Sequence, residues 1–199
     1  MSLIRGIVTG IGLIGVLVIV ALLIGYYLFS LSPPVESRMT KVLPSPEAAQ
    51  SFDQKLETLK AEIDAAISAN EERELTLTIT EKEANSKLTQ LRAKGELPSK
   101  EMWINFGNGY FLIYAVIDVP GVDAKTATMG RIEIVDDNPK VIIQEFNLGK
   151  LPLPKSIDRR VEQLLNIMIR LQLADMPLDI TGVQIKNHQL TVTGITRTT

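Results

Sequence analysis

Only one histidine, His188, is available for acid–base or nucleophilic chemistry. A serine hydrolase would need this histidine beside a serine and a carboxylate in the fold. His188 lies between Asn187 and Gln189, and a polar run between two apolar strands is typical of an exposed hairpin turn. We therefore predict no catalytic residue, and we expect that the protein is not an enzyme.

Local structure also explains the acidic residues that could bind a metal ion or act as an acid–base pair. Residues 136–138, Asp-Asp-Asn, lack the glycine spacing and the later glutamate of a calcium loop, and a turn before Pro139 accounts for them. Glu81 and Glu83 begin a predicted helix, where carboxylates interact favourably with the helix dipole. We expect no metal site.

Glycine and asparagine residues favour turns over a cofactor site. Asn105 and Asn108 flank the glycines of a predicted hairpin and are expected to form turns. None of the glycine groups opens a helix after a strand with the spacing of a phosphate-binding loop. The sequence therefore predicts no cofactor.

The composition argues against two further classes of protein. The formal net charge is −2 and no cluster of lysine and arginine stands out, so nucleic acid is not an expected partner. There is no cysteine, which excludes disulfides, thiolate metal sites, a cysteine nucleophile and a lipoprotein anchor.

Residues 6–31 carry no charge and predict a transmembrane helix. At 1.5 Å per residue the run reaches about 39 Å, more than the roughly 30 Å of a hydrocarbon core. Tyr26, Tyr27 and Phe29 gather at one end, where aromatic rings prefer the headgroup level. A cleaved signal peptide would have a shorter apolar region and a small-residue cleavage site, whereas prolines follow here. We expect a retained single-pass signal-anchor.

The charges beside the span do not decide its orientation, because Arg5 and the amino terminus oppose Arg38 and Lys41. A single N-terminal span before a folded domain most often places that domain outside the cytoplasm. We therefore expect a protein of the cell membrane whose residues 1–5 form a short cytoplasmic tail and whose folded domain lies outside the cytoplasm. The lipid bilayer is an expected partner.

Beyond the span, the sequence predicts a proline-rich spacer over residues 32–46 and one extracytoplasmic domain over residues 47–199. Ser45 is the expected N-cap of the first helix, and Thr80 with Glu83 forms a capping box for the next. Alternating strands, tight turns and one long apolar helix follow. The fold class is α+β: a transmembrane helix, then a curved, mostly antiparallel sheet packed on a long apolar helix.

Two elements are more apolar than a half-buried position requires. The strand over residues 110–119 is apolar on both faces. The helix from about residue 155 is apolar over most of its circumference, with Arg159, Gln163, Asn166 and Arg170 on the remaining arc. A well-filled core explains this surplus, and so does an apolar groove between strand and helix that accepts acyl chains. The groove would be lined by Leu112, Tyr114, Val116, Leu151, Leu153, Leu164, Met168 and Leu171.

The segment between the last strand of this sheet and the long helix alternates leucine with proline. Pro152 and Pro154 cannot donate to a strand ladder and hold Leu151 and Leu153 in extended geometry, so the helix is expected to begin at residues 154–156. The two leucines either close the end of the core or form an apolar lip at the mouth of the groove.

Three stretches, residues 75–88, 143–157 and 183–195, resemble the YpmS-like family of single-span bacterial proteins of unknown function. That family has a Leu-Asn or similar pair in the first stretch, matched here by Ala84 and Asn85. The resemblance implies an extracytoplasmic domain and, more loosely, a fold similar to elongated lipid-binding (TULIP-like) domains. It implies no catalytic residue.

Two functions follow as expectations. The domain binds or handles a lipid or another apolar ligand in a groove between sheet and helix. The alternative is a structural domain of a cell-envelope assembly that binds a protein partner and has no small-molecule ligand.

Overall fold

The computed structural model describes residues 19–119, 122–135, 138–174 and 177–197. Residues 19–30 are helical, and this stretch is here called the N-terminal apolar helix. From residue 46 onward helices and strands follow in the order that the sequence predicts, and the α+β class is confirmed. The elements are η1 (Pro34–Arg38), α2 (Pro46–Ala69), β1 (Glu74–Thr80), α3 (Glu81–Ala93), β2 (Glu101–Phe106), β3 (Phe111–Val119), β4 (Val122–Val135), β5 (Asn138–Leu148), α4 (Lys155–Ala174), β6 (Leu178–Lys186) and β7 (Gln189–Thr196).

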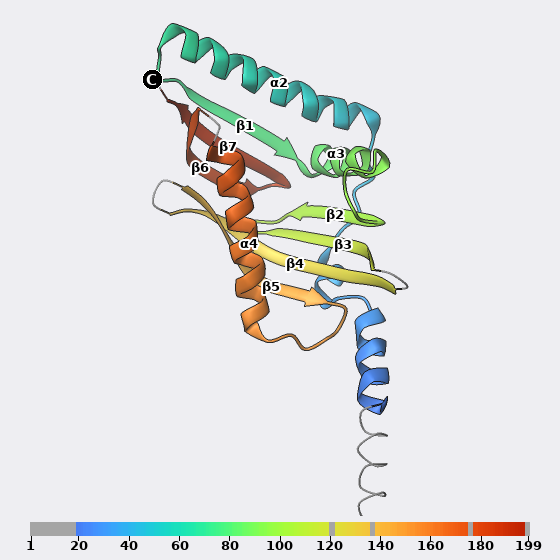
Figure 1. Ribbon diagram of the computed structural model, residues 1–199. Helices are drawn as coiled ribbons and strands as arrows, with labels where there is room; N and C mark the ends of the chain where they lie inside the picture. Colours follow the sequence, from blue (N-terminus) through green and yellow to red (C-terminus); the bar gives the residue numbers. More distant parts are fainter. Residues whose placement is uncertain (1–18, 120–121, 136–137, 175–176, 198–199) are drawn as a thin grey trace, which may run out of the picture.

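The strands form two antiparallel sheets. One has three strands in the order β1-β7-β6, and the other has four in the order β2-β3-β4-β5. Figure 1 shows α2 lying along the three-stranded sheet at the top of the view, with the four-stranded sheet below it and α4 crossing in front. In the same view the N-terminal apolar helix leaves the domain at the lower right.

Short-range signals in the sequence place the helix starts correctly. The Ser45 hydroxyl accepts from the Ala48 amide, with Pro46 in the first turn of α2. Thr80 and Glu83 form both bonds of the capping box at α3. Helix α4 begins at Lys155, within the predicted window. Each signal depends on residues within one helical turn, so distant packing does not override it.

The two predicted hairpins are also confirmed. Residues 107–110 connect β2 to β3, and the Gly107 amide donates to the Tyr110 carbonyl at 2.8 Å. In the last hairpin Val183 lies opposite Val192, as expected, and Asn187 and His188 adopt the positive φ angles that a tight turn requires.

Part of the predicted proline-rich spacer, residues 32–46, is packed on the domain and does not act as a spacer. Residues 33–41 do not hold the domain away from the N-terminal apolar helix but pack on the four-stranded sheet, where Val35 is fully buried against Tyr114 and Ala127. The Thr40 backbone donates to and accepts from the Asn105 side chain at 2.9 Å in each case. Burial of an apolar side chain such as Val35 stabilises the fold by about 2 kcal/mol, which explains why the segment adheres.

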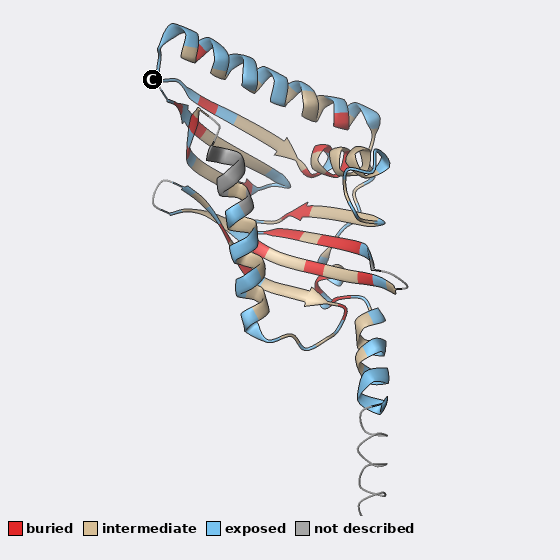
Figure 2. Cartoon of the chain, viewed as in Figure 1, coloured by how far each residue is buried: buried red, intermediate tan, exposed pale blue. Residues whose placement is uncertain are grey.

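Both faces of β3 are covered, which the apolar character of this strand predicted. Leu112 and Tyr114 face the segment that contains Val35. Phe111 and Ile113 face the opposite side, toward α4. Figure 2 shows the buried residues concentrated on the central strands, whereas much of α2 and α4 is exposed. Two buried clusters therefore lie on the two sides of the four-stranded sheet, and a third, around Leu75, lies between the three-stranded sheet and α2.

Candidate functional site

Helix α3 closes one edge of the four-stranded sheet through two side chains. An edge strand presents unpaired amides and carbonyls that would otherwise attract another strand. The Asn85 amide group accepts from the Ile104 amide at 2.9 Å and donates to the Ile104 carbonyl at 2.7 Å. Glu81 accepts from the Phe106 amide, two residues further along β2. We call Glu81 with Asn85 the α3 clamp.

Helix α4 closes the opposite edge in the same way. Asn166 accepts from the Val141 amide and donates to the Val141 carbonyl, both at 2.8 Å, and Glu162 accepts from the Ile143 amide at 2.9 Å. Glu162 with Asn166 is the α4 clamp. In both clamps the glutamate precedes the asparagine by four residues, and the asparagine also donates to that glutamate's carbonyl, at 2.8 Å in α3 and 2.9 Å in α4.

The α3 clamp is enclosed by neighbouring elements. Asn85 is 1% exposed, and Glu81 also accepts from Asn105 at 3.4 Å and contacts His188 Nδ1 at 3.0 Å. Asn105, expected to be a turn residue, is instead buried. That expectation is wrong because the partners of Asn105 are far away in sequence. The α3 clamp therefore joins β2, the β6–β7 hairpin and the segment around Thr40.

His188 lies in an exposed turn, as predicted, with 80% of its side chain accessible. The hollow beside it has a volume of about 90 Å³ and contains the Glu81 carboxylate, but no serine is among its lining residues. Thr40 and Tyr110 also line this hollow, but among the described residues neither hydroxyl is hydrogen-bonded to His188 or Glu81. The geometry here fits a structural contact between α3 and the hairpin turn.

Glu83 forms a second buried ionic contact on α3. Its carboxylate accepts from Ser51 at 2.6 Å and from Lys55 at 2.8 Å, in addition to the capping bonds with Thr80. Burial alone would raise the pKa of Glu83, but these bonds outweigh it and lower the pKa to about 2. The ionised Glu83 thus fastens α2 to the start of α3.

Helix α4 exposes two apolar side chains, Leu164 and Ile167, on the side that faces away from the sheet. We call these two residues the outer face of α4. Leu164 is 63% exposed and Ile167 is 55% exposed, and residues three apart lie on the same face of a helix. The opposite face packs Val161, Leu165 and Ile169 into the core. Both the inner and the clamp positions are therefore occupied, while the outer face has no partner among the described residues.

The predicted groove is wrong in its composition. Leu112, Tyr114 and Val116 are buried under the segment that contains Val35, on the face of the sheet opposite α4. They cannot share a groove with the outer face of α4. Successive side chains of a strand alternate between faces, and the sequence did not indicate which face α4 would cover. The side chains of Met168 and Leu171 lie outside the described residues.

The segment that leads into α4 contacts the end of the N-terminal apolar helix. The Lys150 amide donates to the Leu28 carbonyl at 2.7 Å, and the Gly149 amide donates to the Lys125 carbonyl at 2.8 Å. Gly149 has φ +56°, and a Cβ there would collide with the Phe29 carbonyl oxygen. The positive φ angle and the close approach of the Phe29 carbonyl both require glycine at position 149.

Leu151 and Leu153 are both half-buried in this segment. Full burial would have favoured a plug at the end of the core, and full exposure would have favoured a lip. Both accounts therefore remain predictions.

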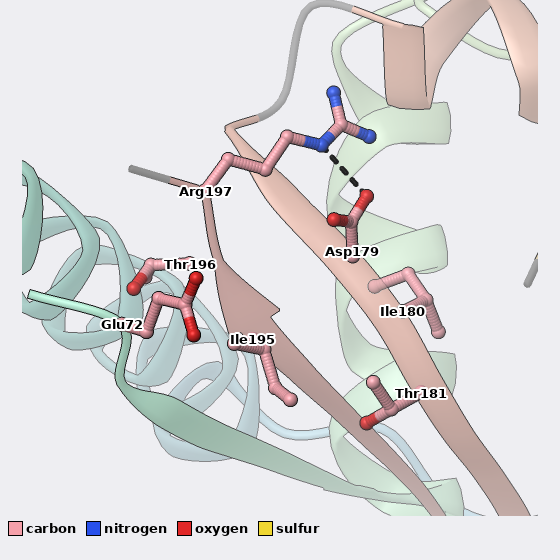
Figure 3. Close-up of a pocket in the computed structure, with 7 residues that line it drawn as sticks. All are labelled: Glu72, Asp179, Ile180, Thr181, Ile195, Thr196 and Arg197. Atoms are coloured by element: carbon pink, nitrogen blue, oxygen red, sulfur yellow. Dashed lines mark hydrogen bonds and ion pairs between the residues drawn. The ribbon is translucent and has the colours of Figure 1, made fainter. Parts of the chain in front are cut away.

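A hollow of about 510 Å³ lies at the far end of the three-stranded sheet. Figure 3 shows the ion pair of Arg197 with Asp179 at its rim and the aliphatic side chains of Ile180 and Ile195 at its wall. The ion-pair distance is 2.7 Å, and both partners are about half exposed. Such a pair contributes little to binding, so we assign no site there. Within the described residues no group of three or more histidine, cysteine, aspartate or glutamate side chains could hold a metal ion.

Among the described residues one stretch, Ile19–Arg38, which begins with the N-terminal apolar helix, is long and apolar enough to cross a membrane by its length and composition. No family model, curated protein or solved structure matches the chain. The resemblance to the YpmS-like family and to TULIP-like domains stays a prediction.

The two clamps are the features that the sequence analysis missed. The signal was present as glutamate followed by asparagine at i+4, in residues 81–85 and 162–166. At this spacing both side chains lie on one helix face and reach backbone groups two residues apart on a strand.

Proposed function

We propose that this chain is a single-span membrane protein whose extracytoplasmic domain handles lipid at the outer face of α4. The observation that carries the proposal is the exposure of Leu164 and Ile167 on a helix whose entry segment is hydrogen-bonded to the N-terminal apolar helix. The domain is a binding module without catalytic activity.

Position beside a bilayer favours lipid as the occupant. Isolated exposed apolar residues are common on protein surfaces, but two on one face of an otherwise clamped helix form a small apolar patch. The Lys150–Leu28 bond holds the segment that leads into α4 against the end of the N-terminal apolar helix. Acyl chains are the most abundant apolar groups at that location, and they need only contact, not a closed cavity.

The extracytoplasmic orientation is proposed from the order of the chain, in which one apolar span comes before the folded domain. Protease added to intact spheroplasts should remove the domain. Full protection of the domain would show that it lies in the cytoplasm. A mature amino terminus near Pro33 would show that the apolar segment is cleaved and that no anchor is retained.

The second candidate is a structural domain that binds an envelope protein through the same face of α4. It is favoured by the rigid mounting of α4, since Asn166 and Glu162 fix the helix on β5. A helix face held in this way can dock into a groove of a partner without reordering.

Photo-crosslinking tests the proposal in membranes that contain the full-length chain. A phospholipid with a photoactivatable acyl chain is incorporated, illuminated and located by mass spectrometry. Trypsin cleaves after Arg160 and Arg170, so residues 161–170 leave as one peptide that contains the whole outer face. We expect lipid adducts on this peptide. Lipid adducts within residues 6–31 and none on residues 161–170 would contradict lipid handling at this face and leave the partner-binding function.

A further inference from the structure

The α4 entry segment, residues 149–160, has a charge opposite to that of the rest of the chain. It contains Lys150, Lys155, Arg159 and Arg160 against a single carboxylate, Asp158, whereas the whole chain has a formal net charge of −2. All four cations are exposed, and none forms an ion pair or side-chain hydrogen bond with a described residue. Asp158 is half-buried in the first turn of α4.

The fold places this segment against the N-terminal apolar helix. The Lys150 amide is bonded to the Leu28 carbonyl, which lies among Tyr26, Tyr27 and Phe29 at the end of the uncharged run. Figure 1 shows the loop between β5 and α4 reaching the level of the uppermost turn of the blue helix of residues 19–30, with the first turn of α4 further to the left. A segment in this position meets the headgroup layer if the helix crosses a bilayer.

Leucine and proline accompany the charges in a way that suits an interface. Leu151 and Leu153 are half-buried and held extended by Pro152 and Pro154. Apolar side chains enter the boundary between headgroups and acyl chains, while lysine and arginine remain with anionic headgroups.

We infer that the α4 entry segment rests on the membrane surface and binds anionic phospholipid headgroups through Lys150, Lys155, Arg159 and Arg160. Each cation near an anionic surface favours contact by roughly fivefold. Lys155, Arg159 and Arg160 lie within about 8 Å along α4, and Lys150 lies in the short loop before it, so the four cations act together. The inference goes beyond acyl-chain handling, and it holds whether or not the outer face of α4 binds lipid.

The absence of cysteine allows a site-specific test in the full-length chain. Ser156 is exposed in the first turn of α4, and Ser68 is exposed near the end of α2. Ser156→Cys and, as a control, Ser68→Cys are labelled with an environment-sensitive fluorophore. The proteins are placed in nanodiscs of phosphatidylcholine alone or with an equal amount of phosphatidylglycerol. Nitroxide-labelled lipid then reports contact with the bilayer by quenching.

We expect about twofold or more additional quenching at position 156 when phosphatidylglycerol is present, and no change at position 68. Lys150→Gln, Lys155→Gln, Arg159→Gln and Arg160→Gln together should abolish this increase. The matched variant changes four exposed lysines elsewhere and should keep it: Lys60, Lys94, Lys140 and Lys186, each to Gln.

Equal quenching at position 156 in the two nanodiscs would overturn the inference. So would an increase that survives neutralisation of the entry segment, or one that the matched variant also loses. Loss of acyl crosslinking on residues 161–170 would not affect this result, because the fluorophore reports headgroup contact.

Discussion

The two edges of the four-stranded sheet are closed by the same arrangement but differ in what lies outside it. At the β2 edge, the α3 clamp is enclosed, with Asn85 only 1% exposed and Glu81 in contact with His188. At the β5 edge, the α4 clamp is half-buried, and the outer face of its helix exposes Leu164 by 63%. The same pair of side chains, glutamate and asparagine, closes an enclosed contact at the β2 edge and attaches a helix with an exposed outer face at the β5 edge.

This difference predicts unequal costs for removing equivalent groups. Asn85→Ala leaves the Ile104 amide and carbonyl without partners in a site that water does not reach. We expect a loss of about 3–4 kcal/mol in the free energy of unfolding, measured by denaturant titration. Asn108→Ala, in an exposed turn, is the control and should cost less than about 0.5 kcal/mol. A loss below about 1 kcal/mol at Asn85 would mean that the α3 clamp is not a structural joint.

The second prediction concerns the pH dependence of the contact between α2 and the start of α3, next to the enclosed edge. The folded-state pKa of Glu83 is about 2, below its ordinary value of 4.5, so its contribution is present above pH 4.5 and is lost as the pH falls toward 2. The shift corresponds to about 3 kcal/mol. Glu83→Gln should remove this component, so the stability difference between the original chain and the variant should shrink between pH 6 and pH 2.5. A difference that is constant over this range would contradict the account.

At the other edge, Asn166→Ala should cost only about 1–2 kcal/mol, because water can reach the Val141 backbone when the half-buried amide is removed. Denaturant titration alongside Asn85→Ala gives the comparison directly. Equal losses at the two positions would show that the edges do not differ as the burial indicates.

Sequence reasoning succeeded where the deciding contacts are local. The Ser45 cap, the Thr80–Glu83 capping box and the Val183–Val192 register each depend on neighbours within one turn of helix or one tight hairpin. The α4 start at Lys155 follows from the prolines before it.

It failed where distant segments decide. Asn105 has the composition of a turn residue but is held by the Thr40 backbone, 65 residues away in sequence. Asn166 was placed with Arg159 and Arg170 on the polar arc of its helix, and the sequence did not indicate that it pairs with Val141. The groove was misassigned because β3 is apolar on both faces. The contact of Val35 with Tyr114 shows that this face is covered by the segment around Val35 and not by α4. Periodicity gives the faces of an element but not the neighbour that covers each face.

The outer face of α4 should contribute least to stability, since neither Leu164 nor Ile167 is buried. Leu164→Ser with Ile167→Ser should change the free energy of unfolding by less than about 0.5 kcal/mol. Leu43→Ser is the matched control, because Leu43 is 82% exposed and lies outside α4.

The most direct test of lipid handling at this face is the yield of the photoactivatable phospholipid on the full-length chain in membranes. For the Leu164→Ser, Ile167→Ser variant we predict a severalfold lower yield on residues 161–170, with unfolding unchanged and with the yield of Leu43→Ser equal to that of the original chain. An unchanged yield in a stably folded double variant would contradict the account.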